Sequence, residues 1–340
     1  MKHPSLLIIG PATAAANNGN WQTARRWSRM LRPAFQVTLA QTWSGAPFDA
    51  MLALHARHSA ESIARWARAQ GTNAVAPGLG VVLTGTDLYR DIQTNAAAQA
   101  SLAHAQHLVV LQECAPSALP AEVRSKARVI FQSASTWQTV MKPQQRLRAV
   151  MVGHLRDEKS PQTLFAAARL LKHHPGICID HIGNALDAEL GRQAQDCAAE
   201  CPGYRWLGGM PHGITRRRIQ RAHVLVHTSR MEGGAHVLME AICSGTPVVA
   251  SKIPGNVGML GLDYAGYFEH GNTRQLADLL VRLRTDQTSA DGLYRLLQTQ
   301  CALRAPLFAP AAEKAALTAL VRDLLHYKTN PETPSPHACA

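Results

Sequence analysis

Two glutamates eight residues apart, Glu232 and Glu240, are the residues best suited by type and spacing to do chemistry. They lie in TSRMEGGAHVLMEAICSGTPVVASKIPGN, residues 228–256, and two glycines follow the first of them directly. Carboxylates accept strong hydrogen bonds from diols such as those of sugars and ribose. Gly233 and Gly234 let backbone N–H groups approach a ligand closely, and N–H groups at a helix N-terminus favour a phosphate. The segment therefore offers acceptors for hydroxyls and donors for phosphate, which are the groups of a nucleotide-sugar.

The elements around the pair must place both carboxylates near one another. The apolar run 222–229 predicts a buried strand, and residues 235–244 predict a helix that ends at Gly245. Glu232 then lies in the loop at the carboxyl end of the strand, and Glu240 lies on the helix. Taken alone, the pair fits a surface glutamate and a helix-face glutamate equally well.

Polar residues also follow the expected strands of the N-terminal half. An Asn/Gly loop separates the strand 5–11 from a helix at 21–31, which is a second place where an anion can bind. The loop lacks the spacings of a dinucleotide fingerprint or a P-loop. Each polar residue alone is more often a satisfied loop residue. As a set at strand ends they suggest a binding site for an anionic acceptor, made by Asn18, Gly19, Asn20, Thr23, His55, Arg57, Ser59 and Thr86.

Short apolar runs alternate with helical patterns along the whole chain, as in βαβ units with parallel sheets. A polar, proline-containing break at 141–148 separates two such series. We therefore expect an α/β protein with two Rossmann-like, doubly wound domains, 1–145 and 146–328, and a flexible tail at 329–340. Ligands of such sheets bind at the carboxyl ends of the strands, so a cleft between the two domains is the expected site.

The expected strands and helices are spread over both halves. The strands are 5–11, 36–40, 48–55, 79–87, 107–112, 127–133, 149–155, 177–183, 204–209, 222–229 and 246–251. The helices include 21–31, 59–71, 160–174, 235–244 and 311–327.

Composition excludes several classes of protein. The 340 residues carry a formal net charge of +12, but few aromatic residues accompany the densest basic run, TRRRIQR at 215–221. We interpret this run as a solvated helix face rather than a nucleic-acid patch. The seven cysteines show no zinc or disulfide spacing, and no apolar run reaches the roughly 20 residues of a membrane span. We expect a cytoplasmic protein with no metal or other cofactor, no nucleic acid and no membrane partner.

The phrase E-G-G-x5-E-A-x2-S-G-T-P-V-V-A is more specific than its two glutamates. With GYFEHGNTRQLADLL at 266–280, it resembles the E-x7-E segment of family 4-type glycosyltransferases, which have the GT-B fold. The resemblance implies that Glu240 holds the nucleotide ribose and that Glu232 contacts hydroxyls of the donor sugar. It also implies that the amides of Gly233, Gly234 and Ala235 line the sugar and phosphate, and that the reaction needs no metal.

A second landmark of that family is the segment G-R-L-x-x-E-K-G, which here reads GHLRDEKSP. Lys159 is similar to the family's diphosphate-binding lysine. His154 occupies the usual arginine position, and Arg156 lies two residues further on, so either can supply the second cation. The resemblance implies that Lys159, Glu232 and His154 take part in catalysis, because a cation stabilises the charge that develops on a departing nucleoside diphosphate.

Several longer phrases resemble a narrower group, the selenosugar synthases of bacterial selenoneine biosynthesis. The phrases are P-A-x-A-A-N-N-G-N-W-Q-T-A-x-R-W, L-H-A-R-x-S, L-T-G-T-D-L-Y-R-D and G-H-L-R-D-E-K-S-P. The resemblance implies a glycosyltransferase that joins selenophosphate to the anomeric carbon of a UDP-sugar, UDP-GlcNAc or UDP-glucose, with loss of UDP and phosphate. A GT-B glycosyltransferase acting on a hydroxyl acceptor and a non-catalytic nucleotide-binding module are the alternatives.

Overall fold

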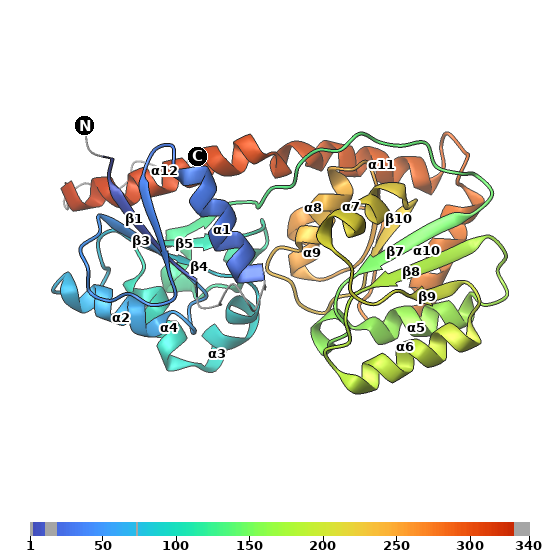
Figure 1. The fold of residues 1–340 in the computed structure, drawn as a ribbon, viewed down its shortest axis with the longest axis horizontal. Coiled ribbons are helices and arrows are strands. Elements are labelled where there is room, and N and C mark those ends of the chain that lie inside the picture. The colour runs from blue at the N-terminus through green and yellow to red at the C-terminus, as the bar shows by residue number, and fades with distance from the viewer. Residues whose placement is uncertain (1–2, 11–18, 73, 330–340) are drawn as a thin grey trace. The chain divides into compact units, whose positions relative to one another are not determined.

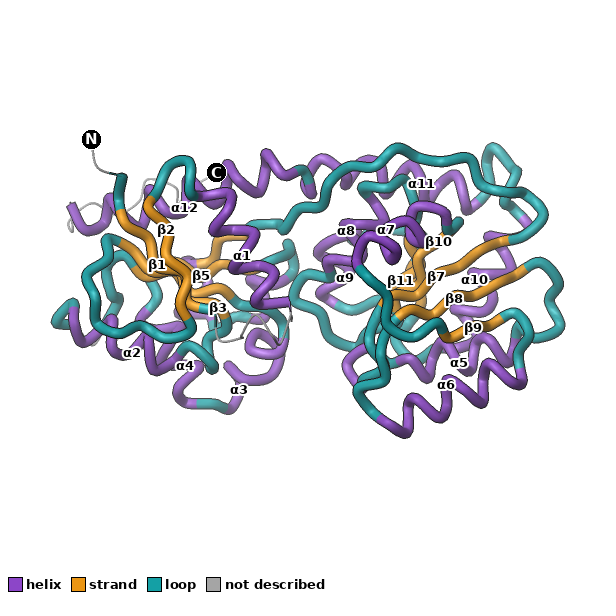
Figure 2. The backbone as a smooth tube through the Cα atoms, in the orientation of Figure 1, coloured by secondary structure: helices purple, strands orange, loops and turns teal. Residues whose placement is uncertain are grey.

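The computed structural model describes residues 3–10, 19–72 and 74–329, and the side chains up to residue 326. The chain forms two compact units: residues 1–131 with 311–340, and residues 132–310. Each unit has a parallel sheet with helices on both of its faces (Figures 1 and 2). The expected α/β class with two Rossmann-like domains is confirmed.

Over its described residues, the first unit is built on six parallel strands in the order β2-β1-β3-β4-β5-β6. Alternate residues of a strand point to opposite faces, so Leu7 and Ile9 belong to one apolar core and Leu6 and Ile8 to the other. The strands are β1 (Ser5–Ile9), β2 (Gln36–Ala40), β3 (Ala50–Leu54), β4 (Leu79–Val82), β5 (His107–Val110) and β6 (Ala127–Val129). The helices are α1 (Gly19–Leu31), α2 (Ala60–Ala69), α3 (Ile92–Thr94), α4 (Ala96–His104) and α12 (Pro310–Thr329).

The last helix, α12, completes the first unit rather than the second. Leu317, Leu320 and Leu324 are buried in the core that also contains Trp27 of α1. The indole Nε1 of Trp27 donates a 2.7 Å hydrogen bond to Glu313. The second domain was expected over 146–328, whereas the second unit ends at residue 310. The difference arises because the apolar face of α12 is buried against β1, β3 and α1.

The second unit has six parallel strands in the order β12-β11-β10-β7-β8-β9. Figure 1 shows α5 and α6 together on one face of this sheet, and α7, α8 and α9 on the other. The strands are β7 (Leu147–Val152), β8 (Ile177–Ile182), β9 (Tyr204–Trp206), β10 (Val224–His227), β11 (Val248–Ser251) and β12 (Tyr267–Phe268). The helices are α5 (Pro161–Leu170), α6 (Ala188–Glu200), α7 (His212–Arg221), α8 (His236–Ile242), α9 (Pro254–Leu260), α10 (Thr273–Thr285) and α11 (Leu293–Arg304).

The segment that follows the first unit's residue 131, residues 132–142, is named the connector here, and it packs on the second unit. The Trp137 amide donates to the Cys243 carbonyl oxygen at 2.8 Å. Thr139 fills the space that a Cβ at Gly245 would need, and the φ of +67° at Gly245 is one that glycine adopts without strain. The unit boundary therefore precedes the expected one at residue 145.

Two expectations about local structure are wrong. The strand expected over 79–87 ends at Val82, and Asp87–Asp91 form a π-helix instead. The Asp87 carboxylate accepts hydrogen bonds from the amides of Ala56 and Thr84, and these bonds turn the chain away from the strand direction. The basic run 215–221 lies on α7 as expected, but Arg216 is buried, so the run is not a uniformly solvated face.

Candidate active site

Glu232 lies in the loop between β10 and α8, and Lys159 reaches its carboxylate from the segment before α5. Lys159 Nζ lies 2.5 Å from Glu232 Oε1, and the two side chains are only 16% and 12% exposed. The aliphatic part of the Lys159 side chain packs over Gly153. A Cβ atom added at Gly153 would lie 3.5 Å from the Lys159 side chain, which is ordinary van der Waals contact. The Thr228 hydroxyl donates to the Lys159 carbonyl oxygen at 2.7 Å. The fold therefore brings together two residues that lie far apart in the sequence.

His227, the last residue of β10, also contacts Glu232. Its Nε2 lies 3.2 Å from Glu232 Oε1, and the ring is fully buried. Burial lowers the pKa of His227, so the ring is neutral and can donate from Nε2. Burial raises the pKa of Glu232, but the Lys159 charge and the His227 contact outweigh it and hold that pKa well below its usual range. Glu232 is thus ionised at neutral pH.

Glu240 lies on α8 and gathers a different set of donors. His212 Nε2 lies 2.5 Å from Glu240 Oε1, His236 Nδ1 lies 3.4 Å from it, and Arg216 Nη1 lies 3.7 Å from it. Burial raises the pKa of Glu240, but hydrogen bonds from His236 and His212 bring it below the ordinary value. The contacts converge on Oε1. Within the described ranges, no residue donates a hydrogen bond to Oε2 of either glutamate.

The loop between these carboxylates presents backbone donors. In the part of the chain that the structure describes, the amides of Gly233, Gly234 and Ala235 have no hydrogen-bond acceptor. The helix that follows begins at His236, as the sequence predicted to within one residue. Free amides beside two ionised carboxylates can bind an anionic and a hydroxylated group side by side.

Two residues, His154 and Arg156, are the candidates for the second cation of this region. Burial and the charges of Arg156 and Lys159 lower the pKa of His154, whose Nδ1 accepts a hydrogen bond from the Asn184 amide. His154 is therefore a neutral ring with one nitrogen engaged. Arg156 is about half exposed, and its Nε lies 3.9 Å from Glu158. Of the two, Arg156 carries the charge.

In the first unit, a charged cluster lies at the carboxyl ends of β3 and β4. His55 follows β3 directly and has a φ of 71°, a value uncommon outside glycine. Its Nε2 lies 3.3 Å from the Thr86 hydroxyl and 3.9 Å from Asp91 Oδ2, and its ring stacks on His58. Burial lowers the pKa of His55, and His58 and Arg57 lower it further against the opposing effect of Asp87 and Asp91.

Arg57 is the charged residue of the set expected to bind an acceptor, and it is exposed. Its Nε lies 2.9 Å from Asp91 Oδ2, and its side chain is 41% exposed. Ser59 and Thr23 are buried, and their hydroxyls donate to the carbonyl oxygens of Leu54 and Gly19, respectively.

Two further expected acceptor residues, Gly19 and Asn20, begin α1. Asn18 lies outside the described residues. The structure thus brings together His55, Arg57 and Thr86, whereas Thr23 lies on a different element.

Several contributors to these sites were not among the residues singled out from the sequence. His227, His212, Arg216 and Asp91 contact the carboxylates or histidines described above. Only their position after a strand or on a neighbouring helix could have pointed to them. His227 ends a buried strand directly before the E-x7-E segment, and this was the one available signal.

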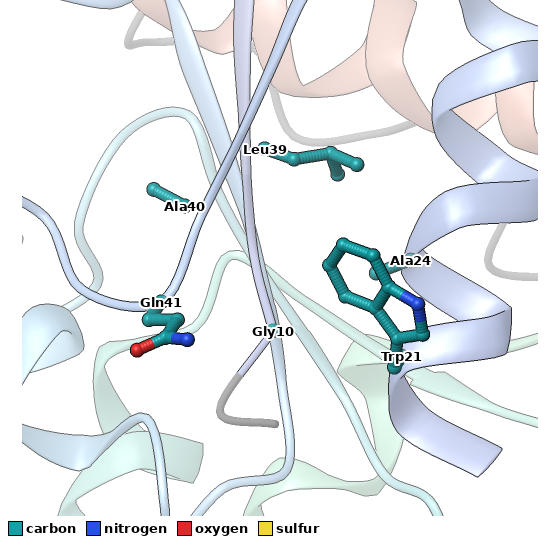
Figure 3. Close-up of a pocket in the computed structure, with 6 residues that line it drawn as sticks. All are labelled: Gly10, Trp21, Ala24, Leu39, Ala40 and Gln41. Atoms are coloured by element: carbon teal, nitrogen blue, oxygen red, sulfur yellow. The ribbon is translucent and has the colours of Figure 1, made fainter. Parts of the chain in front are cut away.

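A cavity of about 190 Å³ opens beside α1 in the first unit (Figure 3). It lies at the carboxyl ends of β1 and β2, and its lining is mainly apolar. The lining residues are Gly10, Trp21, Ala24, Leu39, Ala40 and Gln41. The described residues contain no group of three or more His, Cys, Asp or Glu side chains that could hold a metal ion. They also include no helix with the length and apolar character that a membrane crossing requires.

Residues 138–295 match the family described as Glycosyl transferases group 1, and this range contains Lys159, Glu232 and Glu240. The chain is also similar to "Glycosyltransferase 1 domain-containing protein 1" of Xenopus tropicalis, at 26% identity over 140 residues. That match covers 40% of this chain and 40% of the relative.

Solved structures resemble the whole fold. Sucrose-phosphate synthase from Thermosynechococcus elongatus gives a TM-score of 0.75 at 15% identity, covering 96% of this chain and 100% of the other. At 15% identity this similarity shows the fold.

Two further structures extend the comparison. HepE of Anabaena, solved with UDP and glucose, gives a TM-score of 0.68 at 14% identity, with 94% of this chain and 100% of HepE covered. The pneumococcal O-GlcNAc transferase GtfA, solved with UDP and GlcNAc, gives 0.61 at 17% identity, with 81% of this chain and 57% of GtfA covered. The two parallel-sheet units of this chain have the GT-B fold.

Proposed function

We propose that this protein is a glycosyltransferase that takes its sugar from a UDP-sugar bound in the second unit. The observation that carries the proposal is a pair of ionised carboxylates, the largely buried Glu232 and the buried Glu240. Each has one oxygen engaged by cations or imidazoles, and among the described residues the other oxygen has no donor. A diol can fill such a vacant oxygen. HepE and GtfA, which have the same fold, were solved with UDP and a sugar.

Each residue of the donor site then has a role that its chemistry suits. Glu240 accepts from the ribose hydroxyls, and Glu232 accepts from hydroxyls of the sugar. The amides of Gly233, Gly234 and Ala235 face the sugar and phosphate. Lys159 already lies beside Glu232 and can stabilise the negative charge of departing UDP. Arg156 supplies the second positive charge, and His154 a neutral donor.

For the acceptor we propose selenophosphate, bound in the first unit. The support is the sequence resemblance together with the half-exposed Arg57 guanidinium beside the exposed His58 ring. Selenium attacks the anomeric carbon, the C1–O bond to UDP breaks, and UDP leaves with the bonding electrons. Water then cleaves the Se–P bond and releases phosphate and the 1-seleno-sugar. An anionic selenium nucleophile needs orientation and charge compensation more than a base.

The test is release of UDP from UDP-GlcNAc and UDP-glucose, each with and without selenophosphate. We expect selenophosphate-dependent release of UDP and phosphate in equal amounts, unchanged by EDTA. Arg57→Ala should raise the KM for selenophosphate about tenfold, while the exposed Arg68→Ala should behave like wild type. Unchanged kinetics in Arg57→Ala would remove that residue from the acceptor site.

One observation favours a hydroxyl acceptor instead. The apolar cavity beside Trp21 and Leu39 would suit the carbon skeleton of an organic acceptor better than selenophosphate (Figure 3). UDP release that is stimulated by organic alcohols and weakened by Trp21→Ala, with no response to selenophosphate, would establish this alternative.

A further inference from the structure

The connector, residues 132–142, is held to the helices that carry the donor-site residues. His236 Nε2 lies 3.2 Å from the carbonyl oxygen of Ser133, and Arg216 Nη2 donates to that of Ser135 at 2.9 Å. The Trp137 amide donates to the Cys243 carbonyl oxygen at 2.8 Å. The contacts hold the connector at every second residue, Ser133, Ser135 and Trp137, as expected for an extended chain that lies on α7 and α8.

Two of the side chains that hold the connector, His236 and Arg216, also face Glu240. His236 Nδ1 lies 3.4 Å from Glu240 Oε1, so one imidazole has the carboxylate at one nitrogen and the Ser133 carbonyl at the other. Arg216 Nη1 lies 3.7 Å from the same oxygen, while its Nη2 faces Ser135. Each side chain therefore bridges the connector backbone and the carboxylate.

Arg216 is an unusual residue to find in this position. Its side chain is only 4% exposed, and its guanidinium lies over the Trp137 ring at 4.8 Å from the ring centre. Within the described residues its buried Nε has no hydrogen-bond acceptor, and Glu240 is the carboxylate beside it. Burying a guanidinium with incomplete pairing costs free energy, so packing alone does not account for an arginine here.

A second link joins Arg216 to the backbone of the glutamate. Arg216 Nη2 also lies 3.2 Å from the Ser244 hydroxyl, and that hydroxyl donates to the Glu240 carbonyl oxygen at 2.7 Å. Arg216 thus contacts Glu240 directly through the carboxylate and indirectly through Ser244. A lysine at this position could not reach all of these partners, because an ammonium on a single stem lacks the spread of the guanidinium.

We propose that Arg216 and His236 are positioning residues that orient the Glu240 carboxylate and dock the connector, so that occupancy of the donor site and docking of the connector stabilise each other. The proposal rests on the proposed function in that Glu240 is taken to bind the nucleotide. When a ribose engages Oε2, the carboxylate is held in one orientation and its contacts through Oε1 to Arg216 and His236 are favoured. By linkage, a docked connector raises the affinity for the nucleotide by the same factor.

The experiment measures hydrogen exchange of the connector amides, the Trp137 amide above all, with and without UDP, alongside UDP affinity by calorimetry. In wild type we expect UDP to slow exchange of this amide about tenfold. Arg216→Lys should weaken UDP binding about tenfold and abolish the response of the connector. His236→Gln, a milder change, should do the same to a smaller extent. The exposed Arg217→Met on the same helix is the matched control and should resemble wild type.

The outcomes separate the two proposals. If UDP binds wild type and leaves connector exchange unchanged, the coupling is overturned and the proposed function stands. If Arg216→Lys and His236→Gln fold normally and retain both UDP affinity and connector protection, the positioning role is overturned. If UDP does not bind wild type at all, the proposed function and the coupling fall together. A loss of folding in Arg216→Lys leaves His236→Gln to decide the matter.

Discussion

Both units place acidic residues at the carboxyl ends of parallel strands, yet they use them differently. In the first unit the Asp87 carboxylate is fully buried and accepts hydrogen bonds from the amides of Ala56, Thr84 and Gly85. In the second unit Glu232 and Glu240 each receive donors from the described side chains on one oxygen only. A carboxylate whose two oxygens serve backbone amides holds the chain together, whereas one with a vacant oxygen can bind a ligand. Under the proposed function, the number of engaged oxygens, rather than burial, distinguishes the ligand-binding carboxylates from the structural one.

The largest effect should come from removing the cation in the second unit. Lys159→Met leaves Glu232 without its nearest positive charge and departing UDP with Arg156 as its remaining cation, so kcat for UDP release should fall on the order of 100-fold. Steady-state kinetics with UDP-GlcNAc and UDP-glucose measure it. Lys172→Met, at an exposed position, is the control. A fall of less than about fivefold in Lys159→Met would mean that this lysine does not serve the leaving group.

The next effect concerns stability and lies in the first unit. Asp87→Asn keeps the shape of the side chain but turns an acceptor toward backbone amides into a donor, so one or two buried N–H groups lose their partner. We expect a loss of about 3 kcal/mol in the free energy of unfolding. UDP affinity should stay within about twofold of wild type, because the second unit has its own core. Denaturant unfolding and calorimetry would show whether Asp87 is structural; a loss of UDP binding in a stable Asp87→Asn variant would contradict the comparison.

A smaller effect is expected from acid. Burial lowers the pKa values of His181 and His223 to about 4. Their unfolded-state pKa is near 6.5, so the unfolded chain binds more protons between pH 6.5 and 4, and stability is lost as the pH falls through that window. The pKa values of Glu232 and Glu240 are lowered from 4.5, so these two residues add to the loss of stability only when the pH falls below 4.5.

His223→Gln tests the acid effect. The His223 ring accepts from the Arg148 amide and donates to the Pro143 carbonyl oxygen, and glutamine offers an acceptor and a donor without titrating. Between pH 7.5 and 4.5 the melting temperature should fall less steeply for His223→Gln than for wild type. At the acid end the difference corresponds to up to about 3 kcal/mol in the free energy of unfolding. The exposed His174→Gln should follow the wild-type curve.

The smallest effect concerns the backbone beside Lys159. Ser160 has φ 45° and ψ 52°, in the left-handed region, and its hydroxyl is hydrogen-bonded to His270. Glycine relieves the strain and alanine does not, while both remove the hydroxyl. Ser160→Gly should therefore be more stable than Ser160→Ala by about 1 kcal/mol. Equal melting temperatures for the two variants would show that the surrounding contacts, and not the backbone, decide stability at this turn.

Much of the second unit was predictable because its determinants are local. The apolar run before Glu232 and the glycine after the helix placed Glu232 in a loop and Glu240 on α8, and both placements are confirmed. In the first unit, the strands 36–40 and 107–112 were likewise predicted to within two residues. A period of two in a buried strand, or a helix stop at glycine, depends on neighbours along the chain.

The misses share the opposite property. The return of α12 to the first unit, the burial of Arg216 and the π-helix at Asp87 all depend on contacts between residues far apart in the sequence or on a carboxylate that captures distant amides. The short strand β12 was also not predicted, since two residues carry too little periodicity to identify a strand.

By itself, the sequence determined the alternation of strands and helices and the spacing of Glu232 and Glu240, because periodicity and turn residues act over a few positions. Only the tertiary structure decided which partners each carboxylate has: Lys159 and His227 for Glu232, and His212, His236 and Arg216 for Glu240. The reason is physical. A carboxylate's charge state and its vacant oxygen depend on atoms within about 4 Å of it, and the fold, not the spacing along the chain, brings those atoms there.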